Sequence, residues 1–314
     1  MTRVESESLE AAESALKEAG FVVSQFCSSR PSCFDFVARK SAVTLLVKFH
    51  ADIDGFSRSD SRELKVISEC VSAISLLMSN RSRGKNLDDD TVYTRYNGLI
   101  VTPKTFEGII TSNAYPLIHA DPGGYSVEID GERIKRRRQK LGLSIGQVAE
   151  MIGISRRTLY GYERGMARAS VAVAYNLVYT LGIPVAKPID VFAKPRKQHG
   201  CFLTRARPAM AVNKLLQRIL KKFTPGNFTA IKRAPFDFVI MVPEEKMRII
   251  GGVTNDKERG LERRVDEILS FSRIVQAHPV LITDGRKPSN KDIECIRENE
   301  LSRIRTPGDL ITEH

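Results

Sequence analysis

The chain has 314 residues, of which 42% are hydrophobic and 27% charged, and its formal charge at pH 7 is +12. This composition is sufficient for packed cores in about two domains, and it excludes a disordered chain and a disulfide-stabilised miniprotein. The apolar runs are far shorter than the roughly 18 residues of a membrane span, the N-terminus does not have the pattern of a secretion signal, and the five cysteines form no CxxC pair, so we expect a cytoplasmic protein with reduced thiols.

The first 120 residues have the pattern of an α/β domain. An amphipathic helix with apolar residues at positions 9, 12, 16 and 19 comes first, and strands are expected at 21–26, 34–37 and 44–49. A long helix is then predicted by the spacing of Leu64, Ile67, Val71, Ile74 and Met78. The polar stretch 81–90 indicates an exposed loop, and 98–102 a last strand before a short helix. The expected order is αβββαβα, and residues 121–130 form a connecting strand.

The excess positive charge lies in the middle of the sequence. Residues 131–222 carry 20 basic and 4 acidic side chains, whereas residues 1–130 carry 14 and 18, and residues 223–314 carry 15 of each. An internal basic segment that is also rich in apolar residues indicates a folded, polyanion-binding module between two other modules. A basic surface that only contacts solvent would give the same count. The order of the residues is therefore needed to distinguish it from a polyanion-binding module.

Two short helical patterns open this middle segment. The first is about ten residues long and ends at Gly142, a residue type that readily adopts the left-handed conformation of a helix C-terminus. The second begins at Ser144, which forms a capping box with Gln147, and it is about two turns long. The two helices therefore have defined ends.

A tight turn at Gly153 leads to a third helix over residues 156–163, which Ser155 caps. Two short helices joined by a glycine turn form a helix-turn-helix. A further apolar stripe predicts a fourth helix that closes the core: Val171, Ala174, Leu177, Val178 and Leu181. We assign residues 131–192 to an all-α domain of four to five helices.

The string GLSIGQVAEMIGISRRTLYGYERG resembles the phage-repressor or XRE class of helix-turn-helix domains. In that class the third helix lies in the major groove of DNA. The resemblance implies base contacts by Arg156, Arg157 and Tyr160, and an arginine can donate two hydrogen bonds to guanine. It implies phosphate contacts by Ser144, Ser155, Thr158, Arg136 and Arg168. A glutamine that often contacts phosphate in the class is replaced by Ile145.

The same resemblance assigns structural roles to other residues of the motif. Arg138 and Glu163 correspond to an internal ion pair of the class, Leu159 to a core residue and Gly153 to the glycine of the turn. Tyr162 shares the helix face of Leu159, so we expect it to be packed inside.

A basic, proline-containing linker is expected at residues 193–208, where Lys197 would contact DNA phosphate. Residues 209–314 then repeat the pattern of the first flank. An amphipathic helix around Leu215 is followed by expected strands at 228–233, 236–239 and 247–253, a helix at 261–275, a strand at 279–283 and a short helix.

The two flanks share the tetrapeptide Phe-Asp-Phe-Val, at 34–37 and at 236–239, and the same order of elements around it. We interpret them as an internal duplication into which the helix-turn-helix domain is inserted. The order resembles the nuclease-like fold shared by restriction endonucleases and archaeal Holliday-junction resolvases. In those enzymes an aspartate on the second strand and an acid-x-lysine on the third hold a divalent metal beside the scissile phosphate.

Each copy contains only some of these metal-binding residues. The first has Asp35 and Lys48, but Leu46 stands at the acid position, and the second has Asp237 with Ile250-Gly251-Gly252 in place of the acid and the lysine. A single carboxylate is a poor magnesium site, so we expect no enzymatic activity, no metal and no cofactor. Three further carboxylates could supply the missing ligand of the first copy: Asp52, Asp54 and Glu63.

Over nearly its full length the chain resembles a family of archaeal helix-turn-helix transcriptional regulators. The resemblance implies a homodimer that binds double-stranded DNA sequence-specifically and represses transcription, with the duplicated flanks as the surfaces for pairing. Two alternatives stay open. One is a metal-dependent, structure-specific nuclease or resolvase, and the other is a non-specific, chromatin-like DNA-binding protein.

Overall fold

A computed structural model describes residues 3–121, 123–193, 215, 228–242, 247–255, 258–285 and 287–311. The chain divides into two compact units. Unit 1 consists of residues 1–50, 54–76 and 192–314, and unit 2 of residues 51–53 and 77–191. No helix in these described ranges is long and apolar enough to cross a membrane. The predicted linker residues 194–208, with Lys197, and most of the helix expected around Leu215 lie outside the described residues.

Unit 1 begins with what we call the first lobe, residues 3–50 and 54–76. Helix α1 (Arg3–Glu18) buries its predicted stripe, including Leu9 and Leu16. Strand β1 (Val22–Val23) pairs antiparallel with β2 (Phe36–Lys40), and β2 pairs antiparallel with β3 (Val43–Asp52). A 3-10 turn, η1 (Ile53–Gly55), leads to helix α2 (Arg58–Cys70), which Ser57 and Asp60 cap reciprocally.

The helix predicted to run through Ile74 and Met78 is too long, and this part of the prediction is wrong. Helix α2 ends at Cys70, and strand β4 spans Ile74–Ser82. Ser72 has a φ of +56°, a left-handed conformation that cannot continue a right-handed helix. Apolar residues of a buried strand happened to fall at helical spacing here, and periodicity alone does not separate the two cases.

The second lobe of unit 1 consists of the described residues between 228 and 311. Its five strands form one sheet in the order β11-β12-β13-β14-β15, with antiparallel pairing up to β13 and parallel pairing beyond it. The strands are β11 (Phe228–Ala230), β12 (Phe238–Val242), β13 (Met247–Thr254), β14 (His278–Thr283) and β15 (Glu294–Arg297). The predicted helix at 261–275 is confirmed as α9 (Leu261–Val275).

After β14 the second lobe departs from the prediction. The sequence pattern predicts a short helix, but the described residues contain strand β15 and two 3-10 turns, η4 (Glu300–Ser302) and η5 (Pro307–Leu310). Cys295 and Ile296 of β15 pair with Leu281 and Ile282 of β14. The extra strand extends the parallel part of the sheet and buries the apolar side chains of β14.

The two lobes share an aromatic core within unit 1. The ring of Phe271 on α9 lies 5.2 Å from that of Phe34 and 4.9 Å from that of Phe236, measured between centroids. All three side chains are buried. Phe34 and Phe236 begin the two Phe-Asp-Phe-Val copies, and helix α9 of the second lobe also packs against β2 of the first. The two flanking segments therefore bury apolar surface against each other inside one chain.

Unit 2 contains a small sheet followed by a group of helices. The sheet strands are β5 (Lys85–Asn86), β6 (Thr91–Arg95), β7 (Gly98–Val101), β8 (Ile118–Asp121) and β9 (Gly124–Val127), and helix α3 (Pro103–Ser112) follows β7. Strand β6 pairs antiparallel with β7 and parallel with β8, and β8 forms a hairpin with β9. The stretch predicted as a loop at 81–90 contains β5, which pairs with the end of β4, so that prediction is wrong in part.

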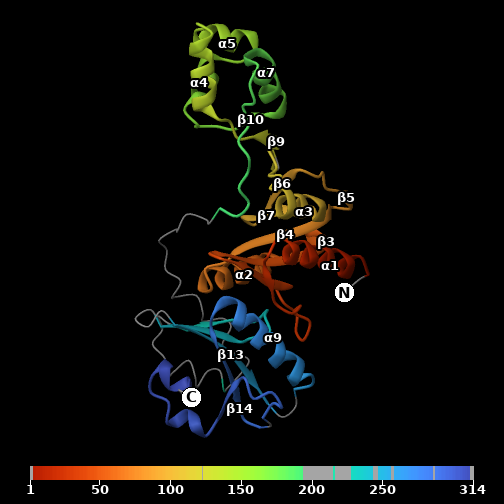
Figure 1. The fold of residues 1–314 in the computed structure, drawn as a ribbon, viewed down its shortest axis with the longest axis vertical. Coiled ribbons are helices and arrows are strands. Elements are labelled where there is room, and N and C mark those ends of the chain that lie inside the picture. Colours follow the sequence, from red (N-terminus) through yellow and green to blue (C-terminus); the bar gives the residue numbers. More distant parts are fainter. Residues whose placement is uncertain are drawn as a thin grey trace. The chain divides into compact units, whose positions relative to one another are not determined.

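The helices of unit 2 pack around one core beside β9 (Figure 1). They are α4 (Gly131–Lys140), α5 (Ile145–Met151), α6 (Arg156–Glu163) and α7 (Val171–Leu181), with the short strand β10 (Ala169–Ser170) between α6 and α7. Strand β10 pairs antiparallel with β9, where Ala169 faces Val127. The hairpin β8–β9 thereby joins the helices to the small sheet.

The helix boundaries predicted for this segment are confirmed, but the buried face of α7 is narrower than expected. Ala174, Leu177 and Leu181 are buried, whereas Val171 and Val178, both predicted as core residues, are exposed. The hairpin β8–β9 supplies Val127 to the same core, and Ile129 adds a second apolar side chain from the loop that follows. Val127 and Ile129 therefore fill part of the core that Val171 and Val178 were predicted to fill.

Candidate functional site

The turn between α5 and α6 is fixed by caps at both helices. The Ser144 side chain accepts a hydrogen bond from the Gln147 amide, and the Gln147 side chain accepts one from the Ser144 amide, which is the predicted capping box. Gly153 has a φ of +72°, and the Ser155 side chain accepts from the Thr158 amide at 3.0 Å. This local bonding sets the direction in which α6 leaves the turn.

Helix α6 presents the three predicted base-contacting residues to solvent. Arg156, Arg157 and Tyr160 are all exposed. Arg157 forms no hydrogen bond or ion pair with the described part of the chain. The guanidinium of Arg164 lies 5.1 Å from the centre of the Tyr160 ring, a cation–π distance. The exposed face of α6 is therefore cationic and carries one aromatic ring.

Arg156 lies against the first turn of α5. A Cβ atom added to Gly146 would be 2.8 Å from Nε of Arg156, so the absence of a side chain at Gly146 gives the guanidinium its space. Sequence reasoning missed Gly146 and also Arg164. The spacing of Tyr160 and Arg164, four residues apart on one helix, was the available signal for the second of these.

The predicted phosphate-contacting residues lie at the starts of α5 and α6, on α4 and after α6. Ser144, Ser155, Thr158 and Arg136 are exposed near the starts of α5 and α6 or on α4. The hydroxyls of Ser155 and Thr158 lie 2.8 Å apart and bond to each other. Arg168 is also exposed, and its guanidinium lies 3.2 Å from a carboxylate oxygen of Asp121. An exposed pair of this kind is weak, so Arg168 can exchange that partner for another anion.

The inner face of α6 is held by apolar and ionic contacts. Leu159 and Tyr162 are buried, and burial raises the pKa of the Tyr162 phenol. Arg138 on α4 donates from Nε and Nη2 to the two carboxylate oxygens of Glu163, at 2.5 and 2.8 Å. A two-pronged arginine–carboxylate pair of this kind fixes distance and orientation together. It ties α4 to the end of α6.

Unit 1 has a polar centre in each lobe, and the first is built on Asp35. Its Oδ1 accepts from Nζ of Lys48 at 2.7 Å, and its Oδ2 accepts from the Phe49 amide at 2.7 Å. Leu46, at the expected acid position, is fully buried. No group of three or more His, Cys, Asp or Glu side chains with metal-binding geometry occurs among the described residues.

Two of the three further carboxylates considered for the first lobe have other hydrogen-bond partners. Asp52, which belongs to unit 2, accepts from the Gly84 amide at 2.9 Å. Glu63 on α2 accepts from the Lys232 amide of the second lobe at 2.7 Å, and burial raises its pKa. Asp52 and Glu63 thus have hydrogen-bond partners other than the Asp35–Lys48 pair.

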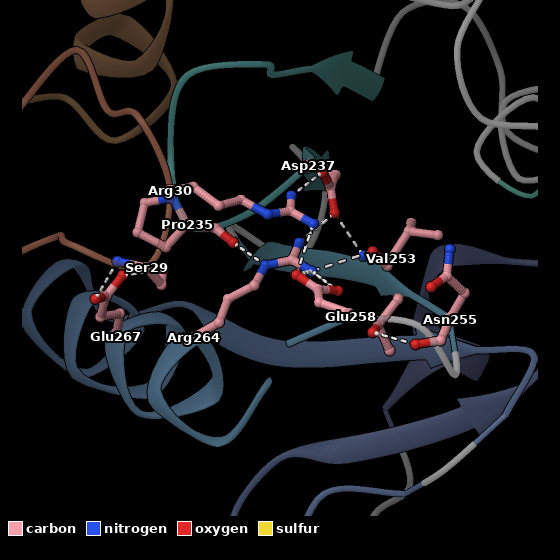
Figure 2. Close-up of polar contacts among 10 residues, drawn as sticks. Ser29, Arg30, Pro235, Asp237, Val253, Asn255, Glu258, Arg264 and Glu267 are labelled. Atoms are coloured by element: carbon pink, nitrogen blue, oxygen red, sulfur yellow. Dashed lines mark hydrogen bonds and ion pairs between the residues drawn. The ribbon is translucent and has the colours of Figure 1, made fainter. Parts of the chain in front are cut away.

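The polar centre of the second lobe surrounds Arg264 (Figure 2). This side chain, from α9, is 1% exposed and donates to the carbonyls of Pro235 and Val253 and to the carboxylates of Asp237 and Glu258. Arg30 reaches in from the first lobe and binds the same two carboxylates, at 2.8 Å to Asp237 and 2.9 Å to Glu258. Burial would raise the pKa of Glu258, but the two guanidinium groups and the Thr254 hydroxyl lower it.

The two centres correspond through their strand registers. The Asp35 amide bonds to the Val47 carbonyl, and the Asp237 amide bonds to the Gly251 carbonyl, so Gly252 occupies the position of Lys48. A Cβ atom at Gly252 would lie 3.2 Å from Nη2 of Arg264. In the second lobe, therefore, an arginine from the helix places its positive charge where the first lobe has a lysine from the strand.

Reciprocal contacts also join the lobes. Glu267 on α9 accepts from the backbone amides of Ser28 and Ser29 in the first lobe, at 2.9 and 2.8 Å, and from both serine hydroxyls. Glu63 on α2 accepts in the same way from the second lobe. Each lobe thus uses a helix carboxylate to bind a loop of the other.

Two segments of the chain match known protein families. Residues 5–116 match the PD-(D/E)XK superfamily domain, and residues 134–187 match the helix-turn-helix family. A solved structure titled "SINR PROTEIN/SINI PROTEIN COMPLEX" aligns with 29% of this chain and 75% of its own at 18% identity, with a TM-score of 0.16.

Three archaeal proteins resemble nearly the whole chain, and each is named as a "Putative HTH-type transcriptional regulatory protein". The Pyrococcus furiosus protein is 31% identical over 95% of this chain and 94% of its own. The Methanocaldococcus jannaschii protein is 31% identical over 92% and 91%, and the Methanosarcina acetivorans protein 30% identical over 94% and 92%. The chain therefore belongs to this archaeal family of helix-turn-helix-type transcriptional regulatory proteins.

Proposed function

We propose that the chain is a sequence-specific regulator that binds double-stranded DNA as a homodimer and inserts helix α6 into the major groove. The observation that carries this proposal is the exposed, cationic face of α6, held by caps on one side and by the Arg138–Glu163 pair on the other. A protein bound at a promoter excludes other proteins from the same DNA. Repression is therefore the simplest form of control.

In this proposal Arg156 and Arg157 read base edges. The planar guanidinium matches O6 and N7 of guanine, and such a contact contributes roughly 1 to 3 kcal/mol of discrimination. The Tyr160 ring, stacked with Arg164, contacts an adjacent base edge or sugar. Ser144, Ser155, Thr158, Arg136 and Arg168 fix the register on the phosphates without reading sequence.

We further propose a domain arrangement in which two copies of one nuclease-like scaffold flank the DNA reader. The copies comprise residues 1–120 and 209–314, with the reader at 131–192 between a connecting strand (121–130) and a basic linker (193–208). The matching registers around Asp35 and Asp237 support a duplication. Lys197 in the linker remains a prediction of the sequence.

The flanking scaffolds are proposed to be non-catalytic. Leu46 places an apolar side chain where a metal-binding acid would be needed, and in the second lobe Arg264 already neutralises Asp237 and Glu258. The match to the PD-(D/E)XK superfamily and the Asp35–Lys48 pair are what favour the alternative, a metal-dependent nuclease or resolvase. Magnesium-dependent cleavage of duplex or branched DNA that disappears in Asp35→Asn would establish that alternative.

The proposed reader is tested by measuring relative affinities across a library of duplexes. We expect Arg156→Ala and Arg157→Ala to lose about 1 to 3 kcal/mol of discrimination at single base positions. Arg168→Ala is the matched control, because it should weaken binding to all sequences equally. Lys197→Ala should do the same and reduce the salt slope by about one unit.

Unchanged relative affinities in both α6 variants would show that α6 is not the reader. If the wild-type chain bound every duplex alike, the proposal of sequence-specific regulation would fail and the chromatin-like alternative would take its place. The library therefore separates these two failures.

A further inference from the structure

Helix α7 carries an exposed apolar stripe along one face. Tyr175 and Tyr179 are 69% and 83% exposed, and Val171 and Val178 lie beside them at 38% and 39%. Positions 171, 175, 178 and 179 fall within about 100° of one another around a helix. Large apolar side chains grouped in this way on a soluble protein mark an interaction surface.

An open groove of about 370 Å³ adjoins this stripe. It is lined by Val178, Leu117 and the turn at residues 182–186, and Leu117 is itself exposed. Val178 belongs to both the stripe and the groove, so together they form one continuous apolar surface in unit 2. We call this surface the α7 face.

Charge indicates which partner fits the α7 face. Residues 131–170, which form the rest of the helical module, contain 10 basic and 3 acidic side chains, whereas none of the 11 residues of α7 is charged. Two copies of a cationic module repel each other through most of their surfaces. Because α7 itself carries no charged side chain, two copies that meet through it place few like charges in contact. Arg137, which donates to the Leu181 carbonyl, is a cation at the C-terminal end of this helix.

Within unit 1, the two lobes bury part of their surfaces against each other. Phe34, Phe236 and Phe271 bury them against each other, and Arg30, Glu63 and Glu267 bridge them. The flanking segments were the surfaces that the sequence suggested for dimerisation. Since they pair inside one chain, the α7 face is the better candidate for pairing between chains.

We propose that the α7 face is the homodimer interface, with the α7 helices of two copies packed antiparallel about a twofold axis near Tyr175. This inference rests on the proposed function, because two linked copies of α6 are needed to read two half-sites. A stripe of four side chains and a groove form a small interface, so we expect micromolar dimerisation. Simultaneous binding to two half-sites then strengthens it.

The test uses sedimentation of the full-length chain and of charge variants at the centre of the helix. In an antiparallel pair, residue 175 of one copy faces the same region of the other. Tyr175→Lys and Tyr175→Glu should each weaken self-association at least about tenfold through like-charge repulsion. An equimolar mixture of the two variants should recover dimers, because opposite charges then meet.

Met151→Lys and Met151→Glu are matched controls, because Met151 is an exposed apolar residue on α5, a helix that contributes no residue to the stripe. Both Met151 variants should dimerise with the same affinity as the wild-type chain. The mixture guards against misfolding, since a chain that fails to fold cannot be rescued by its opposite-charge counterpart. Affinity for a single half-site, measured in parallel, reports on α6 alone.

Loss of dimers in each variant, recovery in the mixture and an unchanged half-site affinity would support the inference. A monomeric wild-type chain, or Tyr175 variants that dimerise as the wild type does, would overturn it while leaving DNA reading by α6 intact. If the wild-type chain showed no sequence preference for a single half-site, that result would instead count against the proposed function. The two failures are thus distinguishable.

Discussion

At the scale of single residues, the second-lobe centre shows how two carboxylates, Asp237 and Glu258, are neutralised by arginines from both lobes. Asp237 was found from the sequence because Phe-Asp-Phe-Val repeats. Arg264 was not, because a lone arginine in a polar run of a helix has no distinguishing pattern. Its neighbour Arg263 is 69% exposed, whereas Arg264 is buried, and only the packing of α9 on the sheet decides which of them enters the core.

We predict that Arg264→Met destabilises the chain by about 3 kcal/mol or more, because it leaves Asp237 and Glu258 with Arg30 as their remaining strong partner. Arg273→Met, at an exposed position of the same helix, is the control and should change the free energy of unfolding by less than about 0.5 kcal/mol. Urea denaturation of both variants measures the difference. Equal stability of the two would mean that the buried network does not stabilise the second lobe.

At the scale of elements, the sequence was most reliable where local bonding sets the boundaries. The ends of α4, α5 and α6 follow from Gly142, the Ser144–Gln147 box and the Ser155 cap, all of which are local signals. The boundary between α2 and β4 depends on Ser72 and on the burial of the residues after it. Tertiary packing determines that boundary, and the apolar spacing did not reveal it.

The contact between α9 and the first lobe supplies a prediction at this scale. Glu267 is almost fully buried and accepts hydrogen bonds from two amides and two hydroxyls across the lobes. Glu267→Gln should lower the free energy of unfolding by about 1.5 to 3 kcal/mol, because it removes a charged acceptor.

Glu262→Gln is the matched control on the same helix. Glu262 binds the Ser289 amide and hydroxyl within its own lobe, in an exposed position. Its replacement should have little effect on chemical denaturation. If the two substitutions were equally mild, the reciprocal carboxylate contacts would not be what holds the lobes together.

At the scale of the whole molecule, charge counting and repeat detection predicted a basic reader between two related flanks. They did not predict that the flanks contact each other. The interlobe residues, such as Arg30 and Ser29, lie in a loop whose sequence has no periodicity. Their partners are more than 200 positions away, so no local pattern could have paired them.

Selection from a pool of random duplexes tests whether α6 reads DNA sequence at paired half-sites. We predict that the wild-type chain, at about 0.15 M salt, enriches a twofold-symmetric motif whose half-sites lie about 10 base pairs apart. Arg157→Ala should lose the preference at one position in each half-site. Binding that enriches no motif and depends on duplex length alone would contradict sequence reading by α6.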